Sequence, residues 1–253
     1  MINVYPPPPV KPWNLQIAQG LVAGTKSVFK FGFNTTLGTT EETVWSGSTL
    51  YAYPTSASTM TVSSGSVLDT AAGTGARTVT ISGLDASYNE QSETVTLNGQ
   101  TAVTTVGTYI RMNRAFVVTA GSTATAQGNI YVGTGAVTTG VPANIYAQML
   151  VGDNQTLMAL WTVPAGYTGY LESAYINAGD TSASQSIIAK FVQRQLGGVF
   201  RVASKVALHD GIGNFFDAIP PSFPEKTDLE VRAVSSAGTN QVGASFTIVY
   251  IAN

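Results

Sequence analysis

The single histidine of the chain, His209, is the first residue to consider for acid–base or nucleophilic chemistry. Asp210 and Gly211 follow it directly, and further carboxylates stand at Asp217 and Asp228. A Ser-His-Asp hydrolase would place such a histidine between a nucleophile and an orienting carboxylate. No motif ties a serine to His209, and the chain has no cysteine, which excludes thiolate catalysis and disulfides. A lone histidine beside turn residues is more often structural or exposed, so we expect no catalysis at this position.

Two loops have the composition of ligand-binding loops but depart from the patterns that such loops require. Residues 72–76 (AGTGA) hold two glycines, yet a strand is expected after them, whereas a phosphate loop needs a helix N-terminus behind its glycines. Residues 85–90 (DASYNE) carry oxygen ligands at alternate positions, as a calcium loop does, but Glu90 stands where the EF-hand turn needs glycine. A plain connection between strands is the preferred interpretation of this second loop, and a surface cation is the alternative.

Carboxylate pairs, which perform glycoside hydrolysis, cannot be selected from the sequence either. The chain has 14 acidic residues, and no spacing or motif singles out two of them. A polysaccharide depolymerase therefore stays an open but unsupported alternative. We predict that the protein is not an enzyme and that it has no cofactor and no resident metal.

The composition indicates a well-supplied core under a surface with few charges. Hydrophobic residues make up 44% of the chain and charged residues 10%, against roughly 25% charged in usual soluble domains. A surface of Ser, Thr, Asn, Gln and Gly buries few charges when another protein covers it, which favours subunits of an assembly, although secreted adhesins share this bias. The net charge of −2 lacks the basic footprint of nucleic-acid binding. The apolar stretches are strand-sized, and residues 1–4 lead into prolines without a signal-peptide pattern, so we expect neither nucleic acid nor membrane as a partner.

An alternation of apolar and polar residues with a period of two indicates β-strands from residue 27 onwards. It is clearest in residues 77–82 (RTVTIS) and 92–97 (SETVTL), where it predicts buried positions at Val79, Ile81, Val95 and Leu97. In the first half of the chain, further strands are expected at residues 26–33, 42–45, 49–53, 109–118 and 128–132. In the second half they are expected at residues 157–163, 170–176, 186–193, 199–208, 228–234 and 244–251.

Residues 133–142 contain few large apolar side chains and are the candidate linker between these two series. We therefore predict an all-β protein with two antiparallel β-sandwich or jelly-roll-like domains, preceded by an extended proline-rich N-terminal arm. The predicted boundaries are residues 1–26 for the arm, 27–140 for the first sandwich and 141–253 for the second. No segment longer than about ten residues has the apolar stripe of a helix, although residues 145–150 could form a turn or two.

The predicted arm contains residues 5–13 (YPPPPVKPW), in which proline fixes φ and removes amide donors. Such a segment should form a polyproline II helix of roughly 25 Å, at about 3.1 Å per residue, without internal hydrogen bonds. One interpretation is a disordered leader, and the other is an arm laid over a neighbouring subunit with its aromatic ends as anchors. The second interpretation gives these candidates for partner binding: Tyr5, Pro6, Pro7, Pro8, Pro9 and Trp13.

A hairpin in the second half can be placed in register from its turn. Gly197 and Gly198 supply the two positive-φ positions that a type I′ turn requires. Pairing about this turn collects apolar side chains on one face, and a slip by one residue would mix the two faces. The predicted core face consists of Ile187, Ala189, Phe191, Val202 and Val206.

The other face of this hairpin is predicted to be basic. The register sets Arg194 opposite Arg201 and Lys190 opposite Lys205, so four of the 12 cations share one small patch. Like charges across a strand pair weaken the pairing by about a few tenths of a kcal/mol. A solvated outer face is the first interpretation, and a docking patch for an acidic surface is the second, which makes these four residues candidates for partner binding.

Four stretches of the chain resemble segments of virion structural proteins of tailed bacteriophages. They are residues 68–85 (LDTAAGTGARTVTISGLD), 93–99 (ETVTLNG), 157–166 (LMALWTVPAG) and 219–228 (IPPSFPEKTD). These strand-and-turn signatures identify a family better than a role. The resemblance implies a particle protein displayed on a phage, such as a capsid decoration, a head fibre, or a tail or neck component. It implies no catalytic residue.

Under this resemblance, the first candidate function is that of a capsid decoration or cement protein that binds the major capsid protein and stabilises the shell. The low charge, the extended arm and two compact β domains favour it, and a homotrimer on the outer capsid surface is its expected form. Such a protein is made in the host cytoplasm and located in the virion. The alternative is a tail, neck or fibre-associated protein that binds host glycans, on which Tyr167, Tyr170 and Tyr175 could stack.

Overall fold

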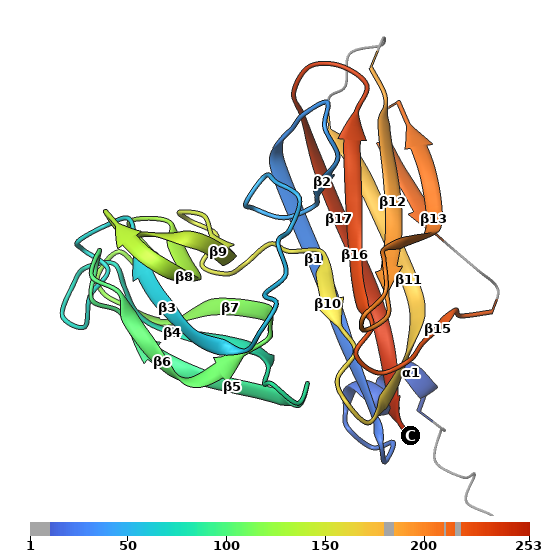
Figure 1. Cartoon of the computed structure of the whole chain (residues 1–253), viewed down its shortest axis with the longest axis horizontal. Helices are drawn as coiled ribbons and strands as arrows, with labels where there is room; N and C mark the ends of the chain where they lie inside the picture. The colour runs from blue at the N-terminus through green and yellow to red at the C-terminus, as the bar shows by residue number, and fades with distance from the viewer. Residues whose placement is uncertain (1–10, 180–184, 210, 216–218) are drawn as a thin grey trace, which may run out of the picture.

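The computed structural model describes residues 11–179, 185–209, 211–215 and 219–253 (Figure 1). Within these residues, seventeen strands form four antiparallel sheets, and there is one short helix. The predicted all-β fold is therefore confirmed. The proline run of the predicted arm, with Tyr5 in front of it, lies outside the described residues.

All the strand pairings that the sheets contain are antiparallel, and most of them join strands that are not consecutive in the chain. Their bounds are α1 (Trp13–Ala18), β1 (Thr25–Leu37), β2 (Glu42–Thr43), β3 (Ser58–Ser64), β4 (Ala76–Leu84), β5 (Glu90–Thr96), β6 (Val103–Tyr109), β7 (Arg111–Ala120), β8 (Ile130–Thr138), β9 (Val141–Met149), β10 (Leu160–Thr162), β11 (Tyr167–Gly179), β12 (Ile187–Arg194), β13 (Arg201–Leu208), β14 (Gly211–Phe215), β15 (Ser222–Phe223), β16 (Asp228–Ser235) and β17 (Asn240–Ala252).

The larger unit is a sandwich of two sheets, on the right of Figure 1. One sheet has the order β1-β17-β11-β14 with β15 paired to β11, and the other has the order β10-β16-β12-β13 with β2 paired to β16. Phe191 from the second sheet packs edge-on against Phe246 from the first, with ring centroids 5.4 Å apart, and lies 6.1 Å from Phe223. These buried rings contribute both apolar area and a preferred geometry to the core between the sheets.

The smaller unit, strands β3 to β9, is inserted between β2 and β10 of the sandwich and is called the inserted unit below. Its sheets have the orders β6-β3-β8-β9 and β5-β4-β7, with a core of their own between them. Val79 pairs directly with Val95 across β4 and β5. Both are buried together with Ile81 and Leu97, as the alternating pattern predicts.

The division into units differs from the predicted boundary at residues 140/141. β1 pairs with β17 from Thr25↔Ile251 to Leu37↔Asn240, so a strand near the N-terminus belongs to the C-terminal sandwich. β9 lies beyond residue 140 but pairs with β8 of the inserted unit. The reason is that pairing between strands distant in sequence is decided by burial of complementary faces, which local periodicity does not report.

Residues 133–142, the predicted linker, form the hairpin between β8 and β9. A Cβ added to Gly133 would lie 1.9 Å from the carbonyl oxygen of Asn144, and the turn uses positive φ at Thr139 and Gly140. Small residues therefore mark close approach of two backbones rather than a linker. Residues 145–150 belong largely to β9 and not to a helix, and residues 49–53 form no strand.

The start of the described chain also differs from the prediction, because the expected arm of residues 1–26 includes a helix. α1 begins at Trp13, directly after Pro12, whose φ of −52° and ψ of 141° are close to polyproline II values and are not helical. Ile17 is buried, whereas the Trp13 side chain is exposed. Trp13 is thus presented by a helix and not by polyproline II.

The turn of the β12–β13 hairpin is not the predicted type I′. Gly197 has φ of 74°, but Gly198 is not in the left-handed region. The Gly198 amide donates a hydrogen bond of 2.9 Å to the Gln195 carbonyl, which closes a turn with glycine at the third position, as type II requires.

The register of this hairpin agrees with the prediction only at its far end. Lys190 lies opposite Lys205, but an irregularity between Phe191 and Val192 sets Arg201 opposite Gln193 instead of Arg194. The predicted core residues at positions 187, 189 and 191 are buried and the one at 206 is partly buried, whereas the one at 202 is exposed. The shift of one residue moves that side chain to the solvent face.

A buried carboxylate, Asp69, closes the loops at one end of the inserted unit. Its Oδ1 accepts hydrogen bonds from the amides of Ala76 (2.7 Å) and Gln127 (2.9 Å). Its Oδ2 accepts from the Ser64 hydroxyl (2.5 Å) and the Gly128 amide (3.0 Å). The glycine loop at residues 72–76 therefore wraps a carboxylate of its own chain and does not form a phosphate cradle.

Replacing Gly75 with alanine is expected to destabilise the protein by about 1–3 kcal/mol, because overpacking a buried site forces neighbours apart. A Cβ at this position would lie 2.0 Å from Oδ1 of Asp69. The measurement is the urea midpoint of the variant compared with the original chain. Gly65→Ala is the matched control, since its nearest neighbour would be 3.8 Å away. Equal midpoints for the two variants would contradict the role assigned to Asp69.

Candidate functional site

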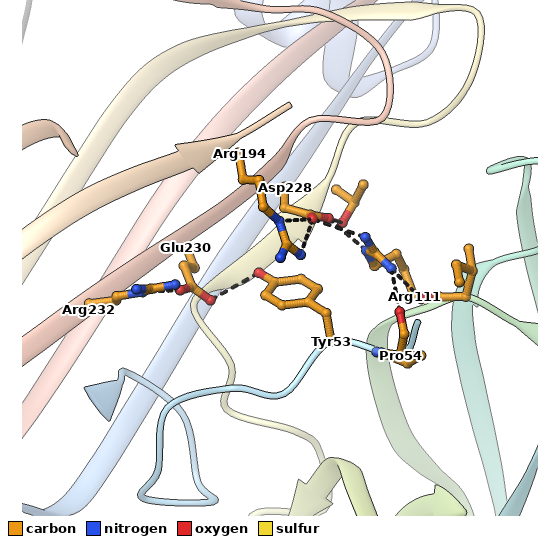
Figure 2. A network of polar contacts seen from close by, with 9 residues as sticks. Tyr53, Pro54, Arg111, Arg194, Asp228, Glu230 and Arg232 are labelled. Atoms are coloured by element: carbon orange, nitrogen blue, oxygen red, sulfur yellow. Dashed lines mark hydrogen bonds and ion pairs between the residues drawn. The ribbon is translucent and has the colours of Figure 1, made fainter. Parts of the chain in front are cut away.

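A group of charged side chains joins the inserted unit to the sandwich (Figure 2). Arg111 reaches from β7 of the inserted unit to Asp228 on β16 of the sandwich. We call this group the junction cluster. It consists of Tyr53, Arg111, Arg194, Asp228, Glu230 and Arg232.

Strand β16 supplies three of these residues because it alternates charged and apolar positions. Leu229 and Val231 point into the sandwich core, where both are fully buried. Side chains at alternate positions point to the opposite face of the sheet, so Asp228, Glu230 and Arg232 share the outer face. Contacts with Arg111 and Tyr53 partly cover this outer face.

Asp228 is the centre of the cluster and is 2% exposed. Arg111 binds both of its oxygens, with Nε 2.7 Å from Oδ1 and Nη2 3.0 Å from Oδ2. Arg194 donates Nε and Nη2 to Oδ2 at 3.0 and 2.6 Å, and the Thr162 hydroxyl donates to Oδ1 at 2.6 Å. Burial by itself lowers the pKa of Arg111, but the hydrogen bonds and charge of Asp228 outweigh it and raise that pKa.

Glu230 is fully buried and forms the second carboxylate of the cluster. The Tyr53 hydroxyl donates to its Oε2 at 3.0 Å, and Arg232 pairs with its Oε1. Burial raises the pKa of Glu230, and the charge and hydrogen bond of Arg232 offset only part of that rise. Burial and the charges of Glu230 and Asp228 raise the pKa of Tyr53 well above its usual value.

Aromatic rings cover the guanidinium groups of the cluster. Arg194 lies 4.6 Å from the ring centroid of Tyr53 and 4.4 Å from that of Phe200. Arg111 lies 5.0 Å from the Tyr53 centroid, and Arg232 lies 4.2 Å from the Phe200 centroid. Stacking of this kind suits arginine, whose weakly hydrated planar group loses less than an ammonium when it leaves water.

A hollow of about 320 Å³ lies over the cluster, lined among others by Tyr53, Tyr88, Arg111, Arg194 and Asp228. The carboxylates in and below it are already held by arginines, and no serine or histidine points a nucleophile or base at them within the described part of the chain. The arrangement fixes the inserted unit on the sandwich.

Two of the predicted partner-binding residues are paired inside the chain. Lys190 forms an ion pair with Glu41, which Arg232 also contacts at 3.4 Å, and Arg194 belongs to the junction cluster. Arg201 and Lys205 are exposed on β13. The predicted basic patch is thus divided between an internal joint and a solvated strand. Of the arm residues, Trp13 lies exposed at the start of α1, and residues 5–9 fall outside the described chain.

His209 stays apart from the carboxylate with which the sequence could have joined it. His209 directly follows β13, and its Nδ1 lies 3.1 Å from the carbonyl oxygen of Gln185. Leu208, the neighbour of His209, pairs with Ile187 at one end of β12, whereas Asp228 pairs with Arg194 at the other end. These two positions of β12 are seven residues apart, so about 23 Å of strand separates them at about 3.3 Å per residue. Asp217 lies outside the described residues.

In the calcium-like loop at residues 85–90, backbone amides of the loop itself donate hydrogen bonds to the carboxylate of Asp85. Oδ1 of Asp85 accepts hydrogen bonds from the amides of Ser87 (2.8 Å) and Asn89 (2.9 Å). The loop joins β4 to β5, as the plain-connection interpretation expects. Across the described ranges, no three His, Cys, Asp or Glu side chains gather as a metal site. The described helix is also too short to cross a membrane.

Tyr53, Arg111 and Glu230 of the junction cluster were not predicted as site residues from the sequence. A signal was present in residues 228–232 (DLEVR), where charges occupy every second position of an apolar strand in a chain with only 10% charged residues. Charges at that spacing predict one polar face, and burial of that face requires counter-charges. Nothing local indicates that the counter-charge is Arg111, which is 117 residues away from Asp228 in sequence.

No family model matches the chain, and no curated protein matches it. Among solved structures it is similar to that of the infectious bursal disease virus Gx strain, with 11% identity, a TM-score of 0.27, and coverage of 90% of this chain and 71% of the other. The structure of the Gt strain gives 11% identity, a TM-score of 0.23, and 96% and 78% coverage. The crystal structure of the VP2 subviral particle of the same virus gives 11% identity, a TM-score of 0.22, and 90% and 77% coverage. Likeness at this level carries no inference about function.

Proposed function

We propose that the protein is a structural component of a tailed-bacteriophage virion, and specifically a capsid decoration protein on the outer surface of the shell. The observation that carries the proposal is the use of its few charges. Three arginines and two carboxylates are consumed in the junction cluster, which leaves two β units held together under a surface poor in charge. Such a body suits permanent contact with other subunits, because covering it dehydrates few ions.

The phage setting rests on the sequence resemblance of residues 68–85, 93–99, 157–166 and 219–228. These stretches cover β4, part of β5, the β10 region and β15, so the resemblance includes both units. The major capsid protein is the proposed partner, and a homotrimer is the proposed form.

A candidate assembly surface lies where the two sheets of the sandwich end, at β13 and β14. Val199, Val202 and Ile212 are 75%, 54% and 77% exposed there, next to the exposed cations Arg201 and Lys205. Another chain can add to a sheet at its terminal strands, and exposed apolar side chains along such strands favour contact with a partner. We call this surface the β13–β14 edge. It would contact an acidic neighbour through its two cations.

The variant with Val202→Ser and Ile212→Ser is expected to bind particles or sister subunits at least tenfold more weakly, since central apolar contacts contribute more than about 1 kcal/mol each. Its melting temperature should stay near that of the original chain, because both side chains are exposed. Particle occupancy and the mass of the purified protein in solution are the measurements. Val106→Ser is the control, as Val106 is 95% exposed on the inserted unit. Full occupancy by the double variant would exclude this edge.

A tail, neck or fibre-associated role that binds host glycans is the second candidate. Tyr175 favours it, because this side chain is half-exposed beside a hollow of about 440 Å³ that Ile212 also lines. Tyr167, by contrast, packs against Tyr250 with centroids 5.2 Å apart.

Copy number separates the two candidates. Quantitative mass spectrometry of purified particles should find hundreds of copies per virion if the protein decorates the capsid. A count of a few to dozens of copies would instead favour the tail or neck, and absence from the particles would overturn the virion role.

A further inference from the structure

The register of the sheet β1-β17-β11-β14 shows which side chains lie on its outer face. Phe31 pairs with Ser245 of β17, and Ser245 pairs with Tyr175 of β11, so these three side chains form one row. Phe246 and Ile176, at the alternate positions, are buried in the core of the sandwich. The row therefore lies on the outer side of the sheet. We call this side the aromatic face, and it carries Phe29, Phe31, Phe33, Tyr175, Ile212 and Ser245.

Large apolar side chains of the aromatic face lie open to solvent. Phe29 is 60% exposed, Tyr175 46% and Ile212 77%. Phe29 stacks on Phe31, with centroids 5.7 Å apart and an angle of 27° between the planes. Ile212 also belongs to the β13–β14 edge, so the two surfaces are continuous. Exposed apolar residues that are scattered need no explanation, but residues gathered on one face of one sheet indicate a contact site.

The aromatic face carries almost no charge. The described residues of its four strands include three charged ones, Lys26, Lys30 and Glu172. Lys26 and Lys30 alternate with the phenylalanines of β1 and so belong to the opposite side of the strand. Lys30 is 6% exposed, and its Nζ donates a hydrogen bond to the backbone carbonyl of Asn113. Glu172 is the extra residue of a bulge in β11 and has no opposite residue in β17.

The other outer face of the sandwich is charged. On the sheet β10-β16-β12-β13, Lys190 lies opposite Arg232 and Arg194 lies opposite Asp228, with Glu230 between them on β16. The inserted unit partly covers this charged face through the junction cluster. The sandwich thus has one charged outer face that contacts the inserted unit and one uncharged outer face that is open.

The aromatic face is large enough for a specific contact between proteins. β1, β11 and β17 have 13 residues each. At about 3.3 Å per residue and about 4.8 Å between strands, they cover roughly 600 Å². The five residues of β14 add to this area. Specific interfaces bury at least about 600 Å² on each partner, so this face reaches the size that a stable oligomer needs.

We infer that the aromatic face is the contact between copies of this chain. Identical charged surfaces repel when they oppose each other, whereas an uncharged face can oppose a copy of itself without that cost. Enrichment in aromatic residues and depletion of charge are the composition of interface cores, and interfaces between identical subunits are the more apolar ones. An acidic or basic partner would find no counter-charge here. The inference rests on the proposed function in one respect, because it names the contact face of the proposed homotrimer.

A neutral glycan in the hollow beside Tyr175 is the competing occupant of this face. The hollow is lined by residues of β11, β14 and β17, and its lining includes no residue of β1 among the described residues. A glycan bound there would leave the phenylalanines of β1 uncovered. A second copy of the chain accounts for the whole face.

The test is the mass of the full-length protein in solution, measured by sedimentation equilibrium over a range of concentrations. The original chain is expected to have the mass of three chains. The variant with Phe29→Ser and Tyr175→Ser is expected to associate at least tenfold more weakly, since aromatic anchors dominate such contacts. Val118→Ser is the control, because Val118 is 51% exposed on the inserted unit, and its mass should not change. Circular dichroism verifies that each variant is folded.

A matched pair of substitutions at Ser245 tests the face by charge alone. Ser245 lies on the central strand β17, between Phe31 and Tyr175. Ser245→Asp places one negative charge on the contact face of every copy and is expected to weaken association at least tenfold at pH 7. Ser245→Asn adds a side chain of the same size without the charge and should associate at least tenfold more tightly than the Asp variant.

Two results overturn the inference. One is a single-chain mass for the original protein, and the other is an oligomer whose mass the substitutions at positions 29, 175 and 245 leave unchanged. A mass of two chains that these substitutions reduce to one would support the aromatic face and overturn the homotrimer. Copy number in particles is measured separately, so failure of the contact face is distinguishable from failure of the virion role.

Discussion

Replacing Arg111 with methionine is expected to destabilise the protein by about 3–5 kcal/mol, the usual cost of breaking a buried ion pair from one side. Asp228 would stay buried with only Arg194 and Thr162 as partners, and Arg194 approaches just one of its oxygens. The bidentate contact is also a link between the two units. Its loss should therefore loosen the inserted unit before the sandwich itself unfolds.

Urea denaturation gives the first effect, and limited proteolysis of the segments between the units gives the second. Arg114→Met is the control, since Arg114 stands on the same strand but is exposed and contacts Gln155. A variant at position 111 as stable and as resistant to protease as the control would show that the junction cluster does not hold the units together.

Replacing Lys30 with methionine is expected to stabilise the protein by several kcal/mol at pH 6, because each unit of pKa shift corresponds to about 1.4 kcal/mol. The pKa of Lys30 is about 7 in the folded chain, against an ordinary value of 10.5. Below pH 7 both states are protonated, so the folded chain carries the full cost of a buried charge. Between pH 7 and 10.5 the unfolded chain binds more protons, so native stability rises with pH. The advantage of the variant should shrink over this range.

Denaturation of both chains at pH 6, 8 and 10 gives the difference at each pH. Lys205→Met is the control and should show little difference at any of them. An advantage for Lys30→Met that stays constant with pH would mean that methionine merely packs better and that Lys30 is not the titrating group.

The features that sequence could predict are those that depend on a residue and its near neighbours. Val79 and Ile81 were assignable to the core because strand geometry places alternate residues on one face, whatever the partner. The pairing of Lys190 with Lys205 could also be predicted, because both residues lie near in sequence to the glycine turn that joins their strands. The irregularity between Phe191 and Val192 was not, because a bulge is decided by the fit of the two strands within the whole sheet.

The candidate site depends on contacts between distant segments, and this is why most of it could not be predicted. The sequence of residues 228–232 shows that this strand has a polar face. Arg111 could be identified as the partner of that face only once β7 had been placed against the sandwich. Arg194 was predicted either to face solvent or to meet a foreign acidic surface, whereas in the structure Asp228 of the same chain supplies the acid. Lys30 is likewise an ordinary residue of an alternating strand until its burial is known.

Because the inserted unit lies within a single connection of the sandwich, it could be replaced without changing how the strands of the sandwich pair. The chain leaves the sandwich and returns to it side by side, where Trp45 and Met158 form an antiparallel bridge. Opposed residues in such a bridge have Cα atoms only about 4.5–5.5 Å apart, which a short turn can span. To the sandwich, the inserted unit is a long loop, and lengthening a loop adds little closure entropy. The inserted unit could therefore be exchanged, in evolution or by engineering, for a domain of different size while every strand pair of the sandwich is kept. The replacement domain would have to supply a cation for Asp228.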